Sequence, residues 1–151
     1  MGRDIADTCP VNPTPWLLPE AAEVAKLHSM LLVELKAPPK EGCVESALGA
    51  AVSAGVYAVE DPADTDLICL SAHTLYYLAR NQCFTDGNKR AAWGALVRIL
   101  DLNGIRIVAD QIEAADFTNA VADKKRDVAE IMTWLLEPGR LVATQSTEPP
   151  T

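Results

Sequence analysis

Hydrophobic residues recur at spacings of three and four positions along most of this chain, which is the pattern of amphipathic helices. The first such stripe starts after Pro19, a residue suited to the first position of a helix, and ends at the breaker Pro38-Pro39. A second stripe covers residues 42–54 and stops at Gly55, the residue type that most often ends a helix. The pattern therefore predicts two helices in the first third of the chain.

The middle of the chain holds its most apolar stretch. Residues 56–60, "VYAVE", alternate weakly between apolar and polar, which predicts a short extended flap. Residues 64–81 are apolar almost all round, so this helix is expected in the middle of a bundle. A further helix is predicted over residues 87–103, with Thr85 or Asp86 as the side chain that caps its first turn.

In the last part of the chain, the residue pattern predicts an extended piece, two more helices and a polar tail. The extended piece is "IRIVA", residues 105–109, and Asp110 is expected to cap a helix that continues to about Ala122. The last helix is predicted over residues 126–136, before a Pro-Gly breaker.

These elements predict an all-α fold, a compact single-domain bundle of about six helices with one short extended flap. A length of 151 residues suits one domain, and a composition that is 49% hydrophobic but only 5% aromatic favours helices over an all-β core. We expect residues 1–15 to form an irregular N-terminal arm, residues 16–139 the folded domain and residues 140–151 a disordered tail.

The net charge of −8 narrows the partners that the chain is expected to bind. Nucleic acids and anionic membranes favour basic surfaces, so neither direct nucleic-acid binding nor membrane binding is expected. The first residues lack the apolar core of a signal peptide, and the four cysteines form no C-x-x-C pair that would suggest zinc or a dense disulfide framework. A reducing cytoplasm is therefore the expected location.

The segment "NQCFTDGNKR", between the two central helices, carries the candidate chemistry. A tight turn at Asp86 and Gly87 that leads directly into a helix aims unpaired backbone N–H groups at one point, where an anion can bind. Asn88 adds a neutral donor, and Lys89 and Arg90 add cations. The carboxylate of Asp86 suits Mg2+ held against phosphate oxygens. Together these residues predict a site for the phosphates of a nucleotide.

The same residues also have plain structural interpretations. Taken singly, an acidic residue here is typical of a helix cap, a Gly-Asn pair of a turn, and two adjacent cations of a solvated helix face. Phe84 stands among polar neighbours and is expected to pack into the core and pin the loop. Spacing alone leaves both interpretations open.

A family resemblance favours the functional interpretation. The residues "QCFTDGNKR" resemble the Fic/Doc signature, H-x-F-x-[D/E]-[G/A]-N-[G/K]-R, at every specified position except the first. The resemblance continues in "LPEAAEVAKLH", "EGCVESAL", "LARN", "RAA" and "LDLNGI", which look like a Doc-type toxin. It covers roughly residues 16–139 and implies a Fic/Doc-like helical domain.

The resemblance also implies a reaction. Members of the family that transfer AMP typically have Gly at the position of Lys89 and a second Arg at the position of Trp93. Doc-type members bind ATP in the opposite direction and transfer its γ-phosphate, and Lys89 favours that branch here. ATP and Mg2+ are then the cofactors, with the nucleotide held by Gly87, Asn88, Lys89 and Arg90.

Two protein partners are implied as well. The target would be a hydroxyl of a translation factor similar to elongation factor Tu, so that modification halts translation. The flap at residues 56–60 would hold the target segment as an added strand. The other partner would be an antitoxin whose disordered C-terminal segment folds into a helix across the toxin, near the first predicted helix and the flap.

Gln82 departs from the signature, which has at this position a histidine that takes the proton from the attacking hydroxyl. An amide forms hydrogen bonds but binds no proton near neutral pH, so Gln82 positions a nucleophile without activating it. His28 and His73 are interpreted as hydrogen-bonded structural residues, and Cys83 as an inert small hydrophobe. We therefore expect nucleotide binding to persist and most transfer activity to be lost.

Three hypotheses follow. The first is a Doc-like protein kinase toxin inactivated at Gln82, whose other catalytic residues are Asp86, Lys89 and Arg90. The second is a Fic-type AMP transferase, and the third is a noncatalytic module that binds a nucleotide or a partner protein. Under the first hypothesis, Gln82→His is expected to restore γ-phosphate transfer.

Overall fold

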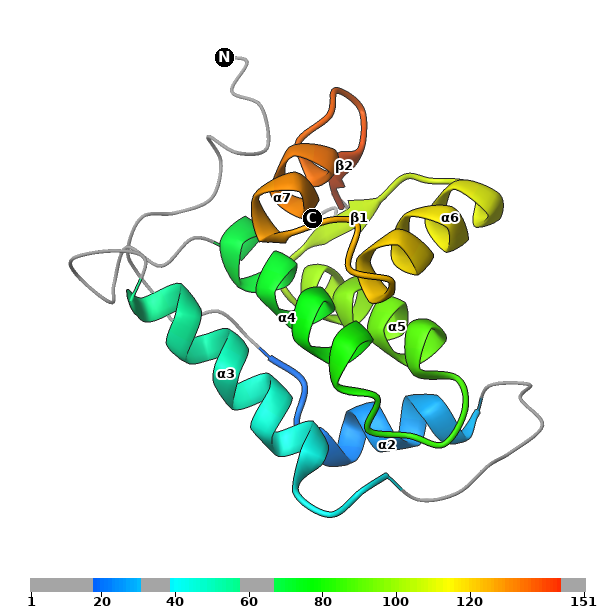
Figure 1. Ribbon diagram of the computed structural model, residues 1–151. Coiled ribbons are helices and arrows are strands. Elements are labelled where there is room, and N and C mark those ends of the chain that lie inside the picture. Colours follow the sequence, from blue (N-terminus) through cyan, green and yellow to red (C-terminus); the bar gives the residue numbers. More distant parts are fainter. Residues whose placement is uncertain (1–17, 31–38, 58–66, 145–151) are drawn as a thin grey trace.

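The computed structural model describes residues 18–30, 39–57 and 67–144 of the chain (Figure 1). Within these ranges the fold consists of six helices and two short strands. The helices are α2 (Ala21–Ser29), α3 (Cys43–Tyr57), α4 (Leu67–Asn81), α5 (Asn88–Leu102), α6 (Gln111–Ala122) and α7 (Val128–Leu135). The strands are β1 (Ile105–Ile107) and β2 (Leu141–Ala143), and the prediction of an all-α fold is confirmed.

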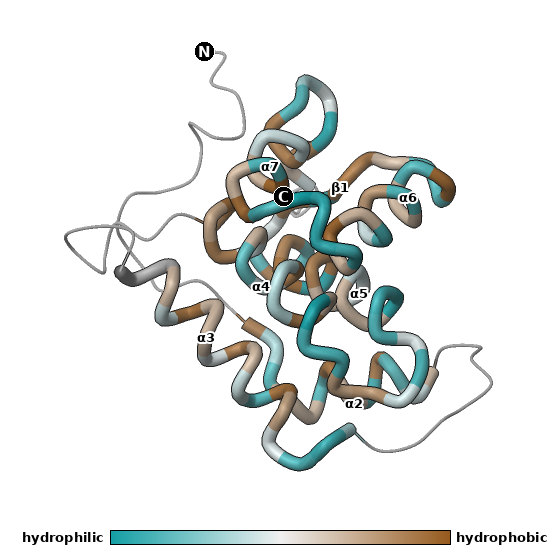
Figure 2. The backbone as a smooth tube through the Cα atoms, in the orientation of Figure 1, coloured by the Kyte–Doolittle hydropathy of each residue, from teal (hydrophilic) through white to brown (hydrophobic). Residues whose placement is uncertain are grey.

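Helix α4 lies in the middle of the bundle and packs against α3, α5, α6 and α7 (Figure 1). Its first half is buried all round, from Leu67 to Ala72, because this stretch has almost no charged or strongly polar side chain. The surrounding helices alternate hydrophobic and hydrophilic residues, whereas the segment that leads into α5 is mostly hydrophilic (Figure 2). The predicted central helix is thus confirmed over residues 67–81; its first predicted residues, 64–66, lie outside the described ranges.

The two strands pair antiparallel, with Ile105 opposite Ala143 at one end. The extended piece predicted at residues 105–109 is confirmed in its first three residues. The disordered tail predicted over residues 140–151 is wrong in its first residues, because Leu141 is buried in the core and β2 supplies the backbone partners of β1. The end of that tail lies outside the described ranges.

Arg140 holds this corner of the molecule together, although it belongs to the predicted tail. Its guanidinium lies 3.9 Å from the centre of the Trp134 ring and donates hydrogen bonds to the backbone oxygens of Trp134 and Val108. It also forms ion pairs of 2.8 Å with Glu113 and 2.7 Å with Glu137. The side chain therefore joins α6, α7 and the residue that follows β1, and its burial is tolerated because the charge is paired and hydrogen-bonded.

Two predicted helix ends differ from the structure. Helix α3 continues through Gly55 to Tyr57, so the first part of the flap predicted at residues 56–60 is helical and the rest lies outside the described ranges. A glycine ends a helix where its backbone turns left-handed, and it otherwise stays helical at modest cost. Helix α2 ends at Ser29 with Met30 as its C-cap, and the remainder of that predicted stripe also lies outside the described ranges.

The starts of the last two helices follow from local side chains. Asp110 caps α6 by accepting a 2.8 Å hydrogen bond from the N–H of Glu113, and the helix ends at Ala122, both as predicted. Asp127 caps α7 in a capping box with Glu130. In the part of the chain that the structure describes, no helix has the length and hydropathy needed to cross a bilayer.

Candidate functional site

The predicted site residues lie in the loop between α4 and α5 and in the first turn of α5. Gly87 is the N-cap of α5 with a φ of 81°, in the left-handed region that costs about 1–2 kcal/mol for a residue with a side chain. No side chain caps this helix, so the prediction of Thr85 or Asp86 as its cap is wrong. Instead, the Asp86 carboxylate accepts a 2.8 Å hydrogen bond from the N–H of its neighbour Gly87. The helix therefore presents the N–H groups of its first turn, and the positive end of its dipole, without a side-chain cap.

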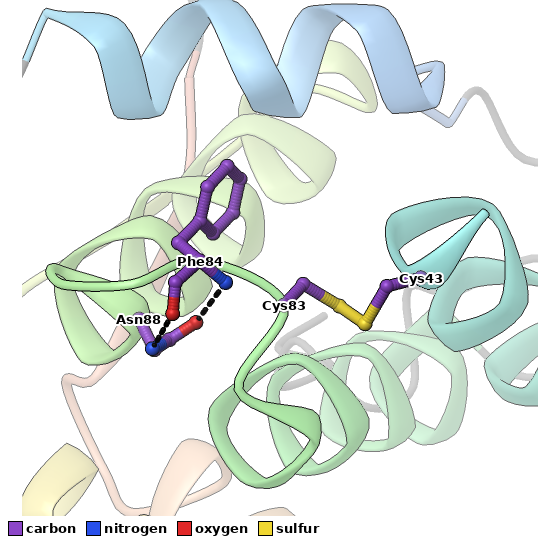
Figure 3. The surroundings of a disulfide bond; sticks show 4 residues. All are labelled: Cys43, Cys83, Phe84 and Asn88. Carbon is purple, nitrogen blue, oxygen red and sulfur yellow. Dashed lines mark hydrogen bonds between the residues drawn. A yellow bond between two sulfur atoms is a disulfide. The ribbon is translucent and has the colours of Figure 1, made fainter. Parts of the chain in front are cut away.

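Asn88 closes the loop on itself. Its Oδ1 accepts a 2.8 Å hydrogen bond from the N–H of Phe84, and its Nδ2 donates one of 2.8 Å to the Phe84 carbonyl oxygen (Figure 3). The side-chain amide, predicted as a donor to the ligand, thus holds the shape of the loop. The donor that Asn88 would offer to an anion is its backbone N–H in the first turn of α5.

Phe84 and His28 fasten the loop to α2. The buried Phe84 side chain points toward α2 (Figure 3). It stacks on the His28 ring with a centroid distance of 3.8 Å. Nε2 of His28 donates a hydrogen bond to the carbonyl oxygen of Asp86. His73, in α4, donates through Nδ1 to the carbonyl oxygen of Cys69 at 2.9 Å. The structural roles predicted for Phe84 and for both histidines are confirmed.

A disulfide bond joins Cys83 to Cys43, the first residue of α3 (Figure 3). The interpretation of Cys83 as an inert free thiol is therefore wrong. The sequence gives no sign of this bond, because the two cysteines are 40 residues apart and form no known motif. The N–H of Lys40 also donates a 2.8 Å hydrogen bond to the carbonyl oxygen of Cys83. The loop is thus anchored to α3 by the disulfide and to the segment just before α3 by a backbone hydrogen bond.

Gln82 and the residues of the first α5 turn line one cavity of about 500 Å³. Gln82 is exposed, and its φ of 52° lies in the left-handed region that is uncommon for residues with a side chain. The other lining residues are Ala79, Thr85, Asp86, Gly87, Asn88, Lys89, Arg90, Ala122 and Asp123. All predicted site residues therefore meet at one cavity.

Asp123, at the end of α6, is a lining residue that the sequence does not predict. Arg80 holds this part of the chain beside the end of α4: its Nε donates to the carbonyl oxygen of Val121 at 3.2 Å, and its Nη2 to that of Arg126 at 3.1 Å. No motif surrounds Asp123, so only the packing of α6 against α4 could have placed it here.

A second cavity, of about 630 Å³, lies between α5 and α6 and shares Lys89 and Arg90 with the first. Trp93 forms part of its wall, and the Trp93 ring meets that of Trp134 edge to face at 6.0 Å. The other lining residues are Gly94, Gln111, Ala114, Ala115, Thr118 and Asn119. The two cations thus stand where a polar cavity adjoins a less polar one.

Mg2+ in a nucleotide site commonly has only one or two protein carboxylates as ligands, and Asp86 could be such a ligand. One of its oxygens accepts the N–H of Gly87, and the other accepts no hydrogen bond from the described residues. No cluster of three potential metal ligands occurs within the described ranges. A metal ion here would rely on one carboxylate and on the phosphates of a ligand, an arrangement that Mg2+ commonly adopts.

Comparison with known proteins shows which proteins this chain is similar to. The chain is 40% identical over 67 residues to Toxin Doc of Mycolicibacterium smegmatis, a match that covers 43% of this chain and 52% of that relative. The chain therefore spans about half the length of the relative that it matches. A model of the Fic/DOC family matches residues 19–100, which is more than half of the chain and includes α4, the loop and the start of α5. The chain thus belongs to the Fic/DOC family.

Proposed function

We propose that this chain is a Doc-type toxin whose site binds ATP with Mg2+ and directs the γ-phosphate toward a hydroxyl of a protein target. The observation that carries the proposal is the single cavity where Asp86, Lys89 and the uncapped start of α5 meet beside residue 82. Membership of the Fic/DOC family and the similarity to Toxin Doc support this class of reaction.

Phosphate binding follows from the first turn of α5. The backbone N–H groups of Asn88 and Lys89 lie where the helix dipole favours an anion. The exposed side chains of Lys89 and Arg90 add local positive charge to a chain whose net charge is −8. Hydrogen bonds from such cations to phosphate oxygens are roughly twice as strong as those between neutral groups. Asp86 would hold Mg2+, which neutralises charge on the transferred phosphoryl group.

The cavity between α5 and α6 supports γ-phosphate transfer over AMP transfer. It adjoins the phosphate site at Lys89 and Arg90, and its wall offers the Trp93 ring to a nucleobase. We infer that the nucleoside lies there, so the phosphates extend from it past the two cations and the γ-phosphate comes nearest to residue 82. The arginine that AMP-transferring relatives have at the position of Trp93 is absent.

Gln82 limits the chemistry of this site. Its side chain is exposed at the cavity where the attacking hydroxyl would lie, but an amide cannot accept the proton of that hydroxyl. A positioned general base contributes about 100- to 10,000-fold in rate, or roughly 3–5.5 kcal/mol of barrier. The phosphate site does not depend on this base, so binding is expected to persist.

The resemblance to Doc-type toxins also indicates which partners the chain would have. We infer a target similar to elongation factor Tu, an antitoxin with a C-terminal segment that folds on the toxin, and action in the cytoplasm. The name of the M. smegmatis relative, Toxin Doc, agrees with a toxin, and a toxin of this kind requires an antitoxin in its host.

The test compares the unchanged chain with Gln82→His, using ATP labelled on either the α- or the γ-phosphate and purified elongation factor Tu as acceptor. We expect Gln82→His to transfer the γ label about 100- to 10,000-fold faster than the unchanged chain. Gln82→Asn is the matched control, because it changes the side chain without supplying a base.

Other outcomes select the alternatives. Transfer of the α label would instead identify an AMP transferase. The intact phosphate site beside Gln82 also favours a noncatalytic binding module, and binding of ATP without transfer of either label by Gln82→His would identify that function.

A further inference from the structure

The Cys43–Cys83 disulfide lies directly beside residue 82, and the proposed reaction gives it no role. Cys83 is 1% exposed, whereas Cys43 is half-buried at the start of α3. Cys69, the other cysteine in the described ranges, is buried in α4 and takes no part in a disulfide. The bond is therefore a specific covalent link between α3 and the loop of the site.

The loop is fastened on two sides, and only one of them adjoins Gln82. Asn88 holds the part of the loop that leads into α5 (Figure 3). His28 holds the same part through the carbonyl oxygen of Asp86. On the other side, Cys83 is held by the disulfide and by the N–H of Lys40. Breaking the disulfide would thus weaken the fastening beside Gln82 and leave the one beside α5 intact.

The backbone of Gln82 needs this support. Its φ of 52° is a left-handed conformation that a residue with a side chain keeps only where its surroundings impose it. Before it, α4 ends at Asn81, and after it comes Cys83, whose position is fixed covalently. The disulfide therefore links the residue next to position 82 covalently to α3, which limits how far the backbone at position 82 can move.

We propose that the Cys43–Cys83 disulfide is a redox-sensitive positioning device for residue 82. With the bond formed, residue 82 is held at the cavity; reduction loosens the backbone of residues 82–83 and leaves the phosphate site at the start of α5 in place. The effect of reduction on phosphate transfer rests on the function proposed above, whereas the effect of reduction on the loop does not. A toxin that acts on a translation factor works where thiols are kept reduced, and disulfides in that compartment are usually transient and regulatory.

The reduction is a two-step exchange with a dithiol. A thiolate of the reductant attacks the sulfur of Cys43, the more exposed of the two; the S–S bond breaks, and Cys83 leaves as a thiolate that takes up a proton. The second thiolate of the reductant then attacks the mixed disulfide and releases Cys43, which also becomes a thiol. Two electrons pass from the dithiol, which ends as a disulfide, to the protein, which ends with two thiols.

The first test needs no nucleotide. Peptide mapping of the full chain without reductant is expected to show Cys43 linked to Cys83. Reduction with dithiothreitol is expected to speed hydrogen exchange at the N–H groups of residues 82–83 at least about tenfold, without faster exchange inside α5. Cys43→Ser is expected to exchange fast with or without dithiol, whereas Cys69→Ser keeps the redox response.

Reduction of the unchanged chain gives the same readout if Cys43→Ser fails to fold. An absent Cys43–Cys83 link, or exchange at residues 82–83 that reduction does not change, overturns the proposal.

The second test uses Gln82→His with γ-labelled ATP in the oxidised and reduced states. We expect reduction to lower the transfer rate about 10- to 100-fold, because a small misplacement of a catalytic group has effects of that size. The affinity for ATP is expected to change less than about threefold, since the first turn of α5 keeps its other fastenings.

Equal transfer rates in the two states, or equal losses of rate and affinity, overturn the positioning role. If Gln82→His transfers no label in either state while the exchange of the loop still responds to dithiol, the proposed function fails and the redox control of the loop stands.

Discussion

Two cationic regions of this molecule, the corner around Arg140 and the first turn of α5, differ in how far their positive charges are buried. Arg140 is 7% exposed, and its guanidinium is engaged by Glu113, Glu137 and two backbone oxygens. Lys89 and Arg90 are exposed and line two adjoining cavities. The contrast shows that a cation paired inside the protein holds the fold, whereas a cation that lines a cavity can bind a ligand.

The two regions also differ in what fixes them. The corner is held by charged hydrogen bonds that converge on one side chain, Arg140. The loop before α5 is held around the site rather than within it, by Asn88, by His28 and by the Cys43–Cys83 disulfide. Changes at the corner are therefore expected to affect stability, and changes at the site to affect binding.

The largest effect is expected from Arg140→Met. It removes two ion pairs and two hydrogen bonds to backbone oxygens, so the free energy of unfolding should fall by about 2–4 kcal/mol. The measurement is urea unfolding, with ATP affinity determined on the folded protein, where no change is expected. Arg140→Lys is the control and should lie in between, because lysine keeps the charge but not the planar fork. A loss of affinity without a loss of stability would break the comparison.

Asn88→Ala should affect both quantities, because Asn88 belongs to the site and also holds the loop. The change leaves the buried Phe84 backbone without two hydrogen bonds, which is expected to cost about 1–3 kcal/mol of stability. ATP affinity should fall as well, since the loop positions the start of α5. Asn88→Asp keeps the acceptor for the Phe84 N–H and should lose less. If Asn88→Ala weakens binding at unchanged stability, the side chain acts on the ligand and not on the loop.

Lys89→Met should affect binding alone. Removal of one cation from the proposed phosphate site is expected to lower ATP affinity about tenfold, or roughly 1.4 kcal/mol, and to make binding less sensitive to salt. The free energy of unfolding should change by less than about 0.5 kcal/mol, as is usual for exposed positions. Titration with ATP at two salt concentrations measures both effects. Lys26→Met, an exposed change in α2, is the matched control, and an equal loss there would mean that only net charge matters.

The smallest effect is a pH dependence at the Arg140 corner. The hydrogen bond from Arg140 lowers the pKa of Glu113 below its ordinary value of 4.5. A carboxyl group with a lowered pKa stabilises the folded state above that ordinary value, and the contribution is lost as the pH falls through the lowered pKa. The stability difference between the unchanged chain and Glu113→Gln should therefore be constant near neutral pH and shrink below 4.5. Thermal unfolding across this range measures it, and a difference that grows toward acid pH would contradict the assignment.

The sequence predicted most of the fold because helices depend on local patterns. The apolar stretch of α4, the Asp110 cap of α6 and the breaker before residue 140 can each be recognised from a short stretch of neighbouring residues. Strand β2 was missed because three residues of ordinary composition become a strand only when β1 lies beside them. The continuation of α3 through Gly55 was missed because glycine is compatible with a helix as well as with its end.

The sequence by itself determined the family and picked out the residues of the candidate site, since the signature from Gln82 to Arg90 is contiguous and needs no fold to be recognised. Only the tertiary structure decided how those residues are supported. It bonds Cys83 to Cys43, seats His28 against Phe84 and brings Asp123 to the cavity. The physical reason is that these contacts join positions far apart in the chain, and such positions meet only when the helices that carry them pack together.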